Sequence, residues 1–343
     1  MHRKAKKYHI ITYGCQMNEH DSEMLAGMLE NMGYRATGKL DEADIILLNT
    51  CIIRKNAELK LFGKVGSLKH LKEKNPELII GIGGCMMQEE AAVEEIYEKY
   101  PQVDLVFGTH NIHRLPELIT RIEENRERII ETWDQDKGLI PDLPYIRESK
   151  YKSWVTIIQG CNNFCSYCIV PYVRGRERSR PLPEIVKEVK ELVEDGVKEI
   201  TLLGQNVNSY GHDREEAYDF ADLLLKLDKI QGLKRIRYMT SHPRDFNLDL
   251  IEVIKNSKSI CEHFHLPVQS GSSKILKKMN RGYNRKQYLK LVKKIKEEIP
   301  TASVTTDFIV GFPGETEIDF QQTLQLVKEL KFDMAFTFKF SPR

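Results

Sequence analysis

The sequence predicts an α/β protein in which an N-terminal parallel-sheet domain is followed by a partial (β/α)6 barrel. Two observations predict this class. Short apolar runs alternate with helical periodicity through the first 130 residues, and a second alternation of the same kind begins after residue 150. The length of 343 residues agrees with two domains of ordinary size.

The first domain, expected at residues 1–130, contains three continuous apolar runs that read as strands. We expect these strands at residues 8–13, 44–49 and 78–83, and helices at 21–32, 55–74 and 89–99. A strand without polar alternation is typical of a parallel sheet that helices cover on both faces. Residues 131–150 lack periodicity and contain Gly138, Pro141 and Pro144, so we predict a linker there.

The second domain, expected at residues 151–343, repeats the strand–helix alternation six times. Its strands are expected at residues 155–159, 199–203, 235–239, 263–268, 304–310 and 335–340. Six units indicate an incomplete barrel, because a complete α/β barrel has eight. An open, doubly wound sheet fits the same pattern almost as well.

The composition excludes several classes of protein. Hydrophobic residues make up 41% and charged residues 30% of the chain, a globular balance. No apolar run approaches the roughly 20 residues of a membrane helix. The basic start is followed only by the apolar pair Ile10 and Ile11, too short for a signal-peptide core. We therefore expect a cytoplasmic protein that does not interact with a membrane.

The net charge of +2 is divided unevenly along the chain. Residues 1–150 carry 21 basic and 25 acidic side chains, a net charge of −4, and the remainder carries +6. A positive second domain suits an anionic partner, although chance alone could produce a difference of this size.

Cysteine is the most informative residue type in this sequence. Seven cysteines cannot all pair, and a chain without an export signal has little use for disulfides. Clustered cysteines here favour metal binding or catalysis. One of the seven, Cys261, lies near no other cysteine in the sequence and is expected to be a buried structural thiol.

Cys161, Cys165 and Cys168 lie within eight residues, directly after the first strand of the second domain. Barrels of this kind carry their chemistry at that face. A structural zinc would need a fourth ligand, which no nearby cysteine or histidine supplies. Three thiolates on a four-iron cluster instead leave one iron open to a small chelating molecule.

Cys15, Cys51 and Cys85 each follow one of the three strands of the first domain. The carboxyl ends of parallel strands meet at one edge of the sheet, where ligands bind. Because neighbouring strands are only ~4.8 Å apart, the three thiols could converge on a second cluster. The alternative is three separate buried thiols.

Two kinds of polar motif lie near these sites. Four arginines follow the cysteine loop and suit phosphate or RNA contact, unless they are merely solvated: Arg174, Arg176, Arg178 and Arg180. A second basic cluster, Lys277, Lys278, Arg281, Arg285 and Lys286, is equally well explained by a helix face and a loop. Strand ends at Gly204-Gln205-Asn206 and Gln269-Ser270 place polar groups at the same barrel face and suit a nucleoside-like cofactor. His242, His263 and His265 have no assignable partner and are interpreted as structural.

These residues resemble a known family. Cys161-x-x-x-Cys165-x-x-Cys168, with Tyr167 before the last cysteine, resembles the signature of radical S-adenosylmethionine (SAM) enzymes. The motifs around Cys15, Cys51 and Cys85 narrow the resemblance to methylthiotransferases. The run from Tyr13 to Asn18 is closest to the MiaB-type tRNA enzymes. The resemblance extends from about residue 13 to residue 343.

The resemblance implies a methylthiotransferase domain followed by a radical-SAM barrel. One [4Fe–4S] cluster on Cys161, Cys165 and Cys168 would bind SAM and cleave it reductively, with Tyr167 beside the cofactor. The resulting 5′-deoxyadenosyl radical would act on C2 of N6-isopentenyladenosine next to the tRNA anticodon. A second [4Fe–4S] cluster, on the other three cysteines, would deliver sulfur, and a second SAM would supply the methyl group. An external electron donor and a monomeric protein are also expected.

Two departures from the family accompany the resemblance. Ile53-Arg54-Lys55 stands where the family usually has Val-Arg-Glu, which puts any role of that acid in doubt. Relatives also continue into a small RNA-binding TRAM domain after the position of Arg343. We therefore expect weaker tRNA binding than that of a full-length relative, as measured by gel shift. Alternative functions are methylthiolation of threonylcarbamoyl-adenosine in tRNA or of a ribosomal protein, or, in a different class, a non-catalytic module that binds zinc and RNA.

Overall fold

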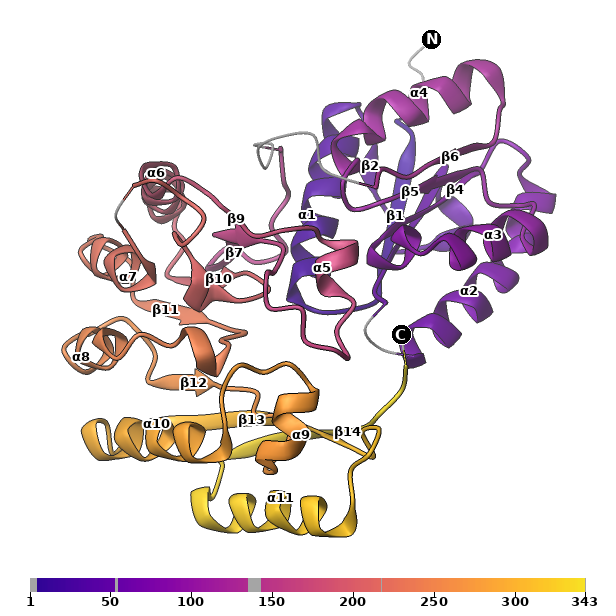
Figure 1. Ribbon diagram of the computed structural model, residues 1–343. Coiled ribbons are helices and arrows are strands. Elements are labelled where there is room, and N and C mark those ends of the chain that lie inside the picture. Colours follow the sequence, from indigo (N-terminus) through magenta and orange to yellow (C-terminus); the bar gives the residue numbers. More distant parts are fainter. Residues whose placement is uncertain (1–4, 53–54, 135–142, 217, 343) are drawn as a thin grey trace. The chain divides into compact units, whose positions relative to one another are not determined.

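The structure is a computed structural model that describes residues 5–52, 55–134, 143–216 and 218–342 (Figure 1). The chain divides into two compact units. The first comprises Met1–Glu148 together with Tyr172–Gly175, and the second comprises Ser149–Pro171 and Arg176–Arg343. The main division falls inside the segment 131–150. Nothing in the sequence predicted that Tyr172–Gly175 belongs to the first unit.

The first unit alternates strands and helices, as the apolar runs predict. Its elements are β1 (Lys7–Thr12), α1 (Gln16–Asn31), β2 (Arg35–Ala36), β3 (Ile45–Thr50), α2 (Lys55–Lys74), β4 (Ile79–Gly84), α3 (Glu90–Lys99), β5 (Leu105–Phe107), α4 (Leu115–Asn125) and β6 (Ile129–Glu131). Figure 1 shows α4 above the sheet and α2 and α3 below it.

Within the described residues these strands form one parallel sheet in the order β2-β1-β3-β4-β5-β6. Strands β3 and β4 are buried along their whole length, because helices cover both faces. The order reverses between β1 and β3, since the chain leaves β1 toward β2 and leaves β3 toward β4. Open α/β sheets bind ligands at the carboxyl ends of the strands beside such a reversal.

Two packing features complete the first unit. Helices α1 and α4 share one apolar core with the sheet, built from side chains such as Leu25, Ile119 and Leu105. The end of the predicted linker packs along α1: the Ile146 amide donates to the carbonyl of Glu23 at 3.0 Å. A Cβ on Gly27 would lie 2.3 Å from the Pro144 carbonyl oxygen, so only glycine admits this close approach. Residues 135–142 of the predicted linker lie outside the described residues.

The second unit continues the alternation. Its elements are β7 (Lys152–Thr156), β8 (Ile158–Gln159), α5 (Val170–Val173, whose last two residues belong to the first unit), β9 (Arg178–Ser179), α6 (Leu182–Glu194), β10 (Glu199–Leu203), α7 (Phe220–Asp228), β11 (Arg235–Tyr238), α8 (Asp249–Lys255), β12 (His263–His265), α9 (Ser273–Lys278), α10 (Arg285–Glu298), β13 (Ser303–Val310), α11 (Glu317–Leu330) and β14 (Met334–Lys339).

The long strands of the second unit lie side by side in chain order. Strands β7, β10 and β11 form one parallel sheet, and β12, β13 and β14 form another. A single parallel bridge between Ile236 and Ile260 continues β11 toward the second sheet. This sequential order is that of a partial barrel, so the predicted α/β class is confirmed, and the open doubly wound order, which would reverse direction, is not observed.

The sequence prediction was wrong in several details. Helix α1 begins at Gln16 rather than residue 21, with Cys15 as its N-cap, a residue type that seldom signals a helix start. The short strands β2, β5 and β6 were missed because two or three residues carry too little periodicity. In the described part of the chain, no helix is long and apolar enough to cross a membrane.

Candidate metal centres

The first unit brings Cys15, Cys51 and Cys85 to one edge of its sheet. They follow β1, β3 and β4, which are neighbours in the sheet, and the paired residues Thr12–Asn49 and Thr50–Gly84 bring the strand ends level. Cys51 and Cys85 are close enough to interact electrostatically. The first two strands flank the reversal in strand order, so the thiols lie where this fold binds ligands.

Two glycines allow the three loops to approach one another. Gly84 has φ +102°, and a Cβ there would lie 2.4 Å from the Thr50 carbonyl oxygen. Gly14 has φ +151°, and a Cβ there would lie 2.9 Å from the Cβ of Cys51. Any larger residue at either position would push the cysteine-bearing loops apart.

Buried amides hold the same loops in place. The Asn18 side-chain nitrogen donates to Asn49 Oδ1 at 3.2 Å and to the Thr50 carbonyl at 3.0 Å. The Asn49 side chain returns a hydrogen bond of 2.8 Å to the Asn18 carbonyl. Helix α1 is thereby fastened to the loop that carries Cys51, which fixes the spacing of the first two cysteines.

Cys85 is buried, like Cys51, and lies beside a charged side chain. Burial raises the pKa of Cys85 to about 11, against the lowering effect of Arg174. Arg174 Nε lies 3.0 Å from Cys85 Sγ, and the Arg174 guanidinium also pairs with Asp21 at 2.6 Å. A thiol in this position binds iron only after it loses its proton, and a neighbouring cation lowers the cost of that loss.

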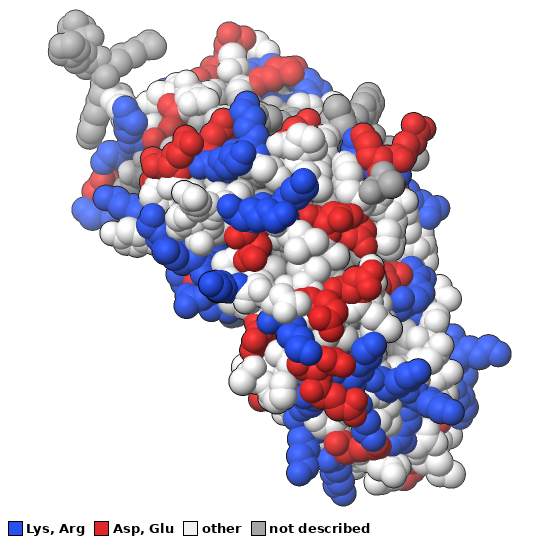
Figure 2. Space-filling view, turned by 90° about the vertical axis from the view of Figure 1, so that its left-hand side faces the viewer, with Lys and Arg blue, Asp and Glu red and all other residues white. Residues whose placement is uncertain are grey.

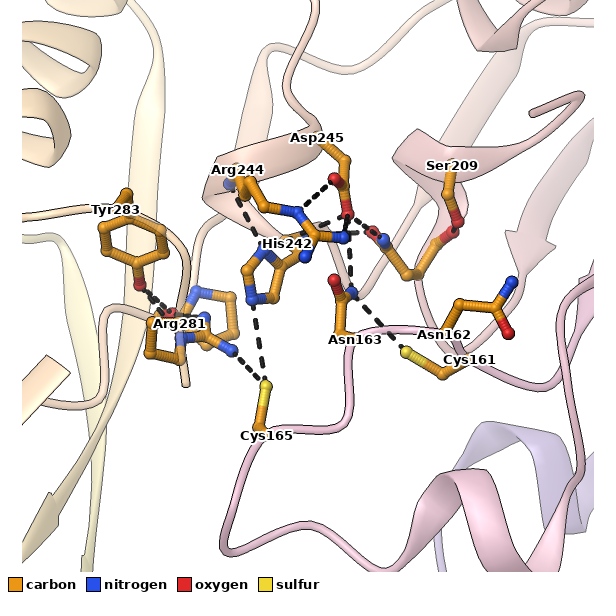
Figure 3. A network of polar contacts seen from close by, with 12 residues as sticks. Cys161, Asn162, Asn163, Cys165, Ser209, His242, Arg244, Asp245, Arg281 and Tyr283 are labelled. Atoms are coloured by element: carbon orange, nitrogen blue, oxygen red, sulfur yellow. Dashed lines mark hydrogen bonds and ion pairs between the residues drawn. The ribbon is translucent and has the colours of Figure 1, made fainter. Parts of the chain in front are cut away.

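The second unit folds Cys161, Cys165 and Cys168 into one compact loop. Phe164 has φ +47°, and the Cys168 amide donates to the Cys165 carbonyl at 2.9 Å, so the loop turns back on itself. In Figure 3 the sulfur atoms of Cys161 and Cys165 point toward the side on which His242 and Asn163 lie. Burial raises the pKa of Cys161, and it raises that of Cys168 to about 12.

A network of polar side chains lies beside this loop (Figure 3). Asp245 Oδ2 accepts hydrogen bonds from the amide side chains of Asn206, at 2.6 Å, and Asn163, at 3.4 Å. Asn206 Oδ1 accepts from the His242 backbone at 2.9 Å. Burial, and then the charges of Arg281 and Arg244, lower the pKa of His242, so its imidazole is neutral near pH 7 and lies 3.9 Å from Cys165 Sγ.

Arg281 is the cation of this second centre. Its side chain is 4% exposed, and Nη1 lies 3.3 Å from Cys165 Sγ and 3.2 Å from the Tyr167 hydroxyl. Its Nη2 donates to the Pro267 carbonyl, and the guanidinium lies over the Tyr283 ring. The basic residues near Arg281 in the sequence suggested an exposed cluster, but Arg281 itself is buried.

Apart from Tyr167, which lies in the cysteine loop, the residues predicted to contact a cofactor follow strands β10 and β12. Gln205 Oε1 accepts from the Gly160 amide, and a Cβ on Gly204 would lie 2.4 Å from Ile158. Gln269 has the unusual φ of +71°, and its buried Oε1 has no hydrogen-bond partner within the described residues. Ser270 is fully buried and accepts from the Ser272 amide at 3.2 Å. An unpartnered buried acceptor of this kind is suited to a ligand.

The donor sets agree with iron–sulfur clusters in their chemistry. Two separate sets of three thiols, each beside a buried guanidinium, provide soft ligands and a compensating charge. Among the described residues, no three His, Cys, Asp or Glu side chains converge closely enough to hold a single metal ion. The thiolates of a four-iron cluster bind different iron atoms and are held apart by the inorganic core.

The four arginines after the cysteine loop do not share one environment. Arg174 is buried between Asp21 and Cys85, and Arg180 pairs with Glu188 at 2.7 Å and with the Thr156 carbonyl. Arg178 contacts Gln159. Arg176 alone among the four is exposed, and its guanidinium lies 4.3 Å from the Phe164 ring centre. The predicted RNA contact of Arg174 and Arg180 therefore disagrees with the internal partners of both side chains.

Several residues of these centres were not found from the sequence. Asp21 resembles an ordinary helix residue, and Asp245 resembles a loop acid, because neither belongs to a local motif. His263 and His265 each contact the Thr305 hydroxyl, whereas His242, which was also interpreted as structural, lies beside Cys165. The departure Ile53-Arg54-Lys55 lies outside the residues whose side chains the structure describes.

A basic groove of about 690 Å³ lies on the outer side of the second unit, away from the cysteines. Helix α10 lines it with Arg285, Lys286, Lys290, Lys293 and Lys294. Figure 2 shows acidic and basic side chains mixed over the face that it presents. This helix contributes much of the positive charge of the second unit.

Comparison with known proteins agrees with both halves of the chain. The Radical SAM superfamily matches residues 155–327, and the uncharacterized protein family UPF0004 matches residues 7–108. Among solved structures, the radical S-adenosylmethionine methyltransferase TsrM from Kitasatospora setae has a TM-score of 0.68 at 14% identity, over 97% of this chain and 73% of that one. The cobalamin-dependent enzyme OxsB has a TM-score of 0.62 at 13% identity, over 94% of this chain and 52% of that one. These likenesses concern the fold.

Curated relatives are much more similar in sequence. The tRNA-2-methylthio-N(6)-dimethylallyladenosine synthase of Desulforamulus reducens is 58% identical over 99% of this chain and 74% of its own length. The protein of the same name from Clostridium tetani is 59% identical over 98% of this chain and 74% of its own length. This chain therefore belongs to the tRNA-2-methylthio-N(6)-dimethylallyladenosine synthase family of radical SAM enzymes.

Proposed function

We propose that this chain methylthiolates C2 of N6-isopentenyladenosine, the dimethylallyladenosine of the relatives' name, next to the anticodon of tRNA. The product is the 2-methylthio derivative. We further propose that the chain carries two [4Fe–4S] clusters, one on Cys161, Cys165 and Cys168 and one on Cys15, Cys51 and Cys85. The observation that carries the proposal is the pair of cysteine triads, one at the carboxyl edge of each unit's strands.

The residues of the second unit suit the binding of a cluster and SAM. A [4Fe–4S] cluster bound there supplies the electron for reductive cleavage of SAM. Arg281 holds Cys165 by a hydrogen bond, and the neutral His242 lies beside the same sulfur without adding charge. Gln269 and Asn206 come from loops at the ends of different strands, and Gln269 offers an unpartnered acceptor to the adenosine or the amino-acid part of SAM.

The residues of the first unit suit the sulfur-donating cluster. Cys85 is buried, and Gly14 and Gly84 leave the space that a bulky inorganic core needs between the loops. Asn18 and Asn49 keep that space fixed by their mutual hydrogen bonds. A rigid, enclosed donor site limits the loss of a reactive sulfur to water.

Several further features complete the proposal. Arg176 is the exposed arginine of the cysteine loop and is suited to contact a tRNA phosphate. An external reductant supplies electrons, the protein acts as a monomer, and its tRNA substrate implies the cytoplasm as its place of action.

The test is a single-turnover reaction of anaerobically reconstituted protein with dithionite, SAM and tRNA that contains N6-isopentenyladenosine. Nuclease digestion and mass spectrometry should show the 2-methylthio nucleoside together with 5′-deoxyadenosine. A parallel reaction uses tRNA that contains threonylcarbamoyl-adenosine, which we expect to remain unmodified. Modification of only the second tRNA would show that threonylcarbamoyl-adenosine is the substrate of the same reaction. Protein that contains full iron but modifies neither tRNA would overturn the proposal.

A further inference from the structure

Arg174 is separated from Cys168 by only five residues, yet it belongs to the first unit together with Tyr172–Gly175. The segment is fastened there by its backbone and its side chain. The Thr109 hydroxyl donates to the Val173 carbonyl at 2.7 Å, and the Arg174 side chain is 7% exposed. A loop that begins in the radical-SAM sequence motif thus contributes a charged side chain to the centre of the first unit.

The Arg174 guanidinium has two sets of contacts. Its Nη2 and Nη1 face the two carboxylate oxygens of Asp21, at 2.6 and 3.5 Å. Its Nε donates to Cys85 Sγ at 3.0 Å, and Cys15 lies close enough to interact electrostatically with the same cation. The pairing with Asp21 therefore fixes the orientation of the Arg174 guanidinium so that its Nε–H faces Cys85.

A purely structural ion pair explains these contacts less well. Buried ion pairs contribute little net stability, because desolvation costs about as much as the attraction returns. A structural pair would also have no reason to direct a third donor at a thiol, which is a weak acceptor while protonated. The thiolate form that binds iron is a much better acceptor.

We propose that Arg174 is a positioning residue for the cluster of the first unit, holding the Cys85 thiolate by a hydrogen bond and raising the cluster's reduction potential. Asp21 orients Arg174 and offsets part of its charge. This inference rests on the proposed function, because it requires a cluster on Cys15, Cys51 and Cys85. It goes beyond that function by giving a task to two residues that bind neither iron nor substrate.

The signs of the expected effects follow from electrostatics. Reduction adds one negative charge to the cluster, so a nearby cation favours the reduced form and a nearby anion opposes it. A hydrogen bond to a ligand sulfur also favours the reduced form. Arg174→Gln should therefore lower the midpoint potential, whereas Asp21→Asn should raise it. If the pair were merely structural, both substitutions would break the same pair and would not shift the potential in opposite directions.

The experiment uses the full chain with Cys161, Cys165 and Cys168 each replaced by Ala, so that only the first cluster can form. Iron and sulfide are counted after anaerobic reconstitution, and the potential is measured by a redox titration followed by electron paramagnetic resonance. The variants are Arg174→Gln, Arg174→Lys, Asp21→Asn and the double variant Arg174→Gln/Asp21→Asn. Lys72→Gln is the matched control, because Lys72 pairs with Asp104 at 2.7 Å. Asp104 directly precedes β5, so this pair lies at the amino ends of the strands, opposite the cysteines.

We expect a lower potential for Arg174→Gln, a higher one for Asp21→Asn, an intermediate value for the double variant and no shift for Lys72→Gln. Arg174→Lys keeps the charge and should lie closer to the parent than Arg174→Gln. If Arg174→Gln binds no iron, its restoration by Arg174→Lys supports the same role. Equal potentials, or shifts of one sign in Arg174→Gln and Asp21→Asn, would overturn the inference. Absence of iron from the parent would instead overturn the second cluster and, with it, this inference.

Discussion

The Nη1 atom of Arg281 lies 3.3 Å from the Sγ atom of Cys165, although 116 positions separate the two residues. The first unit contains a matching contact between Arg174 and Cys85. The two arginines differ in what else they touch. Arg174 is paired with a buried carboxylate, whereas Arg281 contacts two tyrosine hydroxyls and a backbone carbonyl. The two centres thus place different net charges beside their thiolates.

Replacement of Arg281 should slow the cleavage of SAM. A hydrogen bond to a charged group contributes about 1.5–3 kcal/mol, so Arg281→Met should reduce the rate of 5′-deoxyadenosine formation about tenfold or more. Arg281→Lys should recover part of that loss. Arg235→Met, which removes a guanidinium paired with Glu199 at 2.7 Å at the start of β11, is the control. Wild-type rates in Arg281→Met with full iron content would contradict this role.

The two triads should be separable by their products. Cys165→Ala removes a proposed ligand of the SAM-binding cluster and should abolish 5′-deoxyadenosine. Cys85→Ala should leave 5′-deoxyadenosine formation intact and abolish the methylthiolated nucleoside, because it affects only the sulfur-donating centre. Both products are measured in the same reaction by mass spectrometry. Separate roles for the two triads would be contradicted if Cys85→Ala retains about four irons but forms no 5′-deoxyadenosine.

Gly84→Ala should disrupt the first centre, both because of the backbone conformation of Gly84 and because the added Cβ would clash with a neighbouring loop. At φ +102° and ψ −171° the backbone of Gly84 lies in a region almost restricted to glycine, where another residue costs about 1–3 kcal/mol, and the added Cβ would also lie 2.4 Å from the Thr50 carbonyl oxygen. Gly33→Ala is the matched control, since Gly33 has φ +88° and no atom within 4 Å of the added Cβ. We expect Gly84→Ala to lose the irons of the first unit and Gly33→Ala to keep them. Equal iron content and equal melting temperatures in the two variants would contradict the proposed crowding.

Asp319 should stabilise the loop Gln269–Ser272, the proposed SAM contact, and this stabilisation should be lost at acid pH. Hydrogen bonds from Lys274, Thr316 and Ser272 lower the pKa of Asp319. Asp319 Oδ1 accepts from Ser272 at 2.7 Å, directly after Gln269-Ser270-Gly271. Because the folded-state pKa lies below the ordinary value, the stabilisation is complete above that value and is lost as pH falls through the folded-state pKa.

The corresponding experiment compares melting temperatures of wild type and Asp319→Asn across pH. Asp319→Asn should melt a few degrees lower above about pH 5, and the difference should shrink as the pH falls below 4. Its KM for SAM should also rise, because the loop is less firmly held. A difference in melting temperature that is constant down to pH 2.5 would exclude the ionised carboxylate as the cause.

The sequence alone predicts where the six cysteines of the two triads lie relative to the strands, because the signal is local. Each follows an apolar run, and parallel strands bring their carboxyl ends to one edge whatever the details of packing. The contacts that tune those cysteines are not local. Asp21 and Arg174 lie 153 positions apart, and nothing in either sequence segment indicates the other. The sequence did not separate Arg281 from its basic neighbours for the same reason: Lys277, Lys278 and Lys286 are exposed, whereas Arg281 is buried.

The most direct test of the two-cluster account is an iron and sulfide count on anaerobically reconstituted protein in which one triad at a time is replaced. The wild type should contain about eight irons and a matching amount of sulfide per chain. Replacement of Cys161, Cys165 and Cys168 by Ala should leave about four, and replacement of Cys15, Cys51 and Cys85 should also leave about four. Zinc in stoichiometric amount instead of iron, or an iron content unchanged by replacement of either triad, would contradict the account.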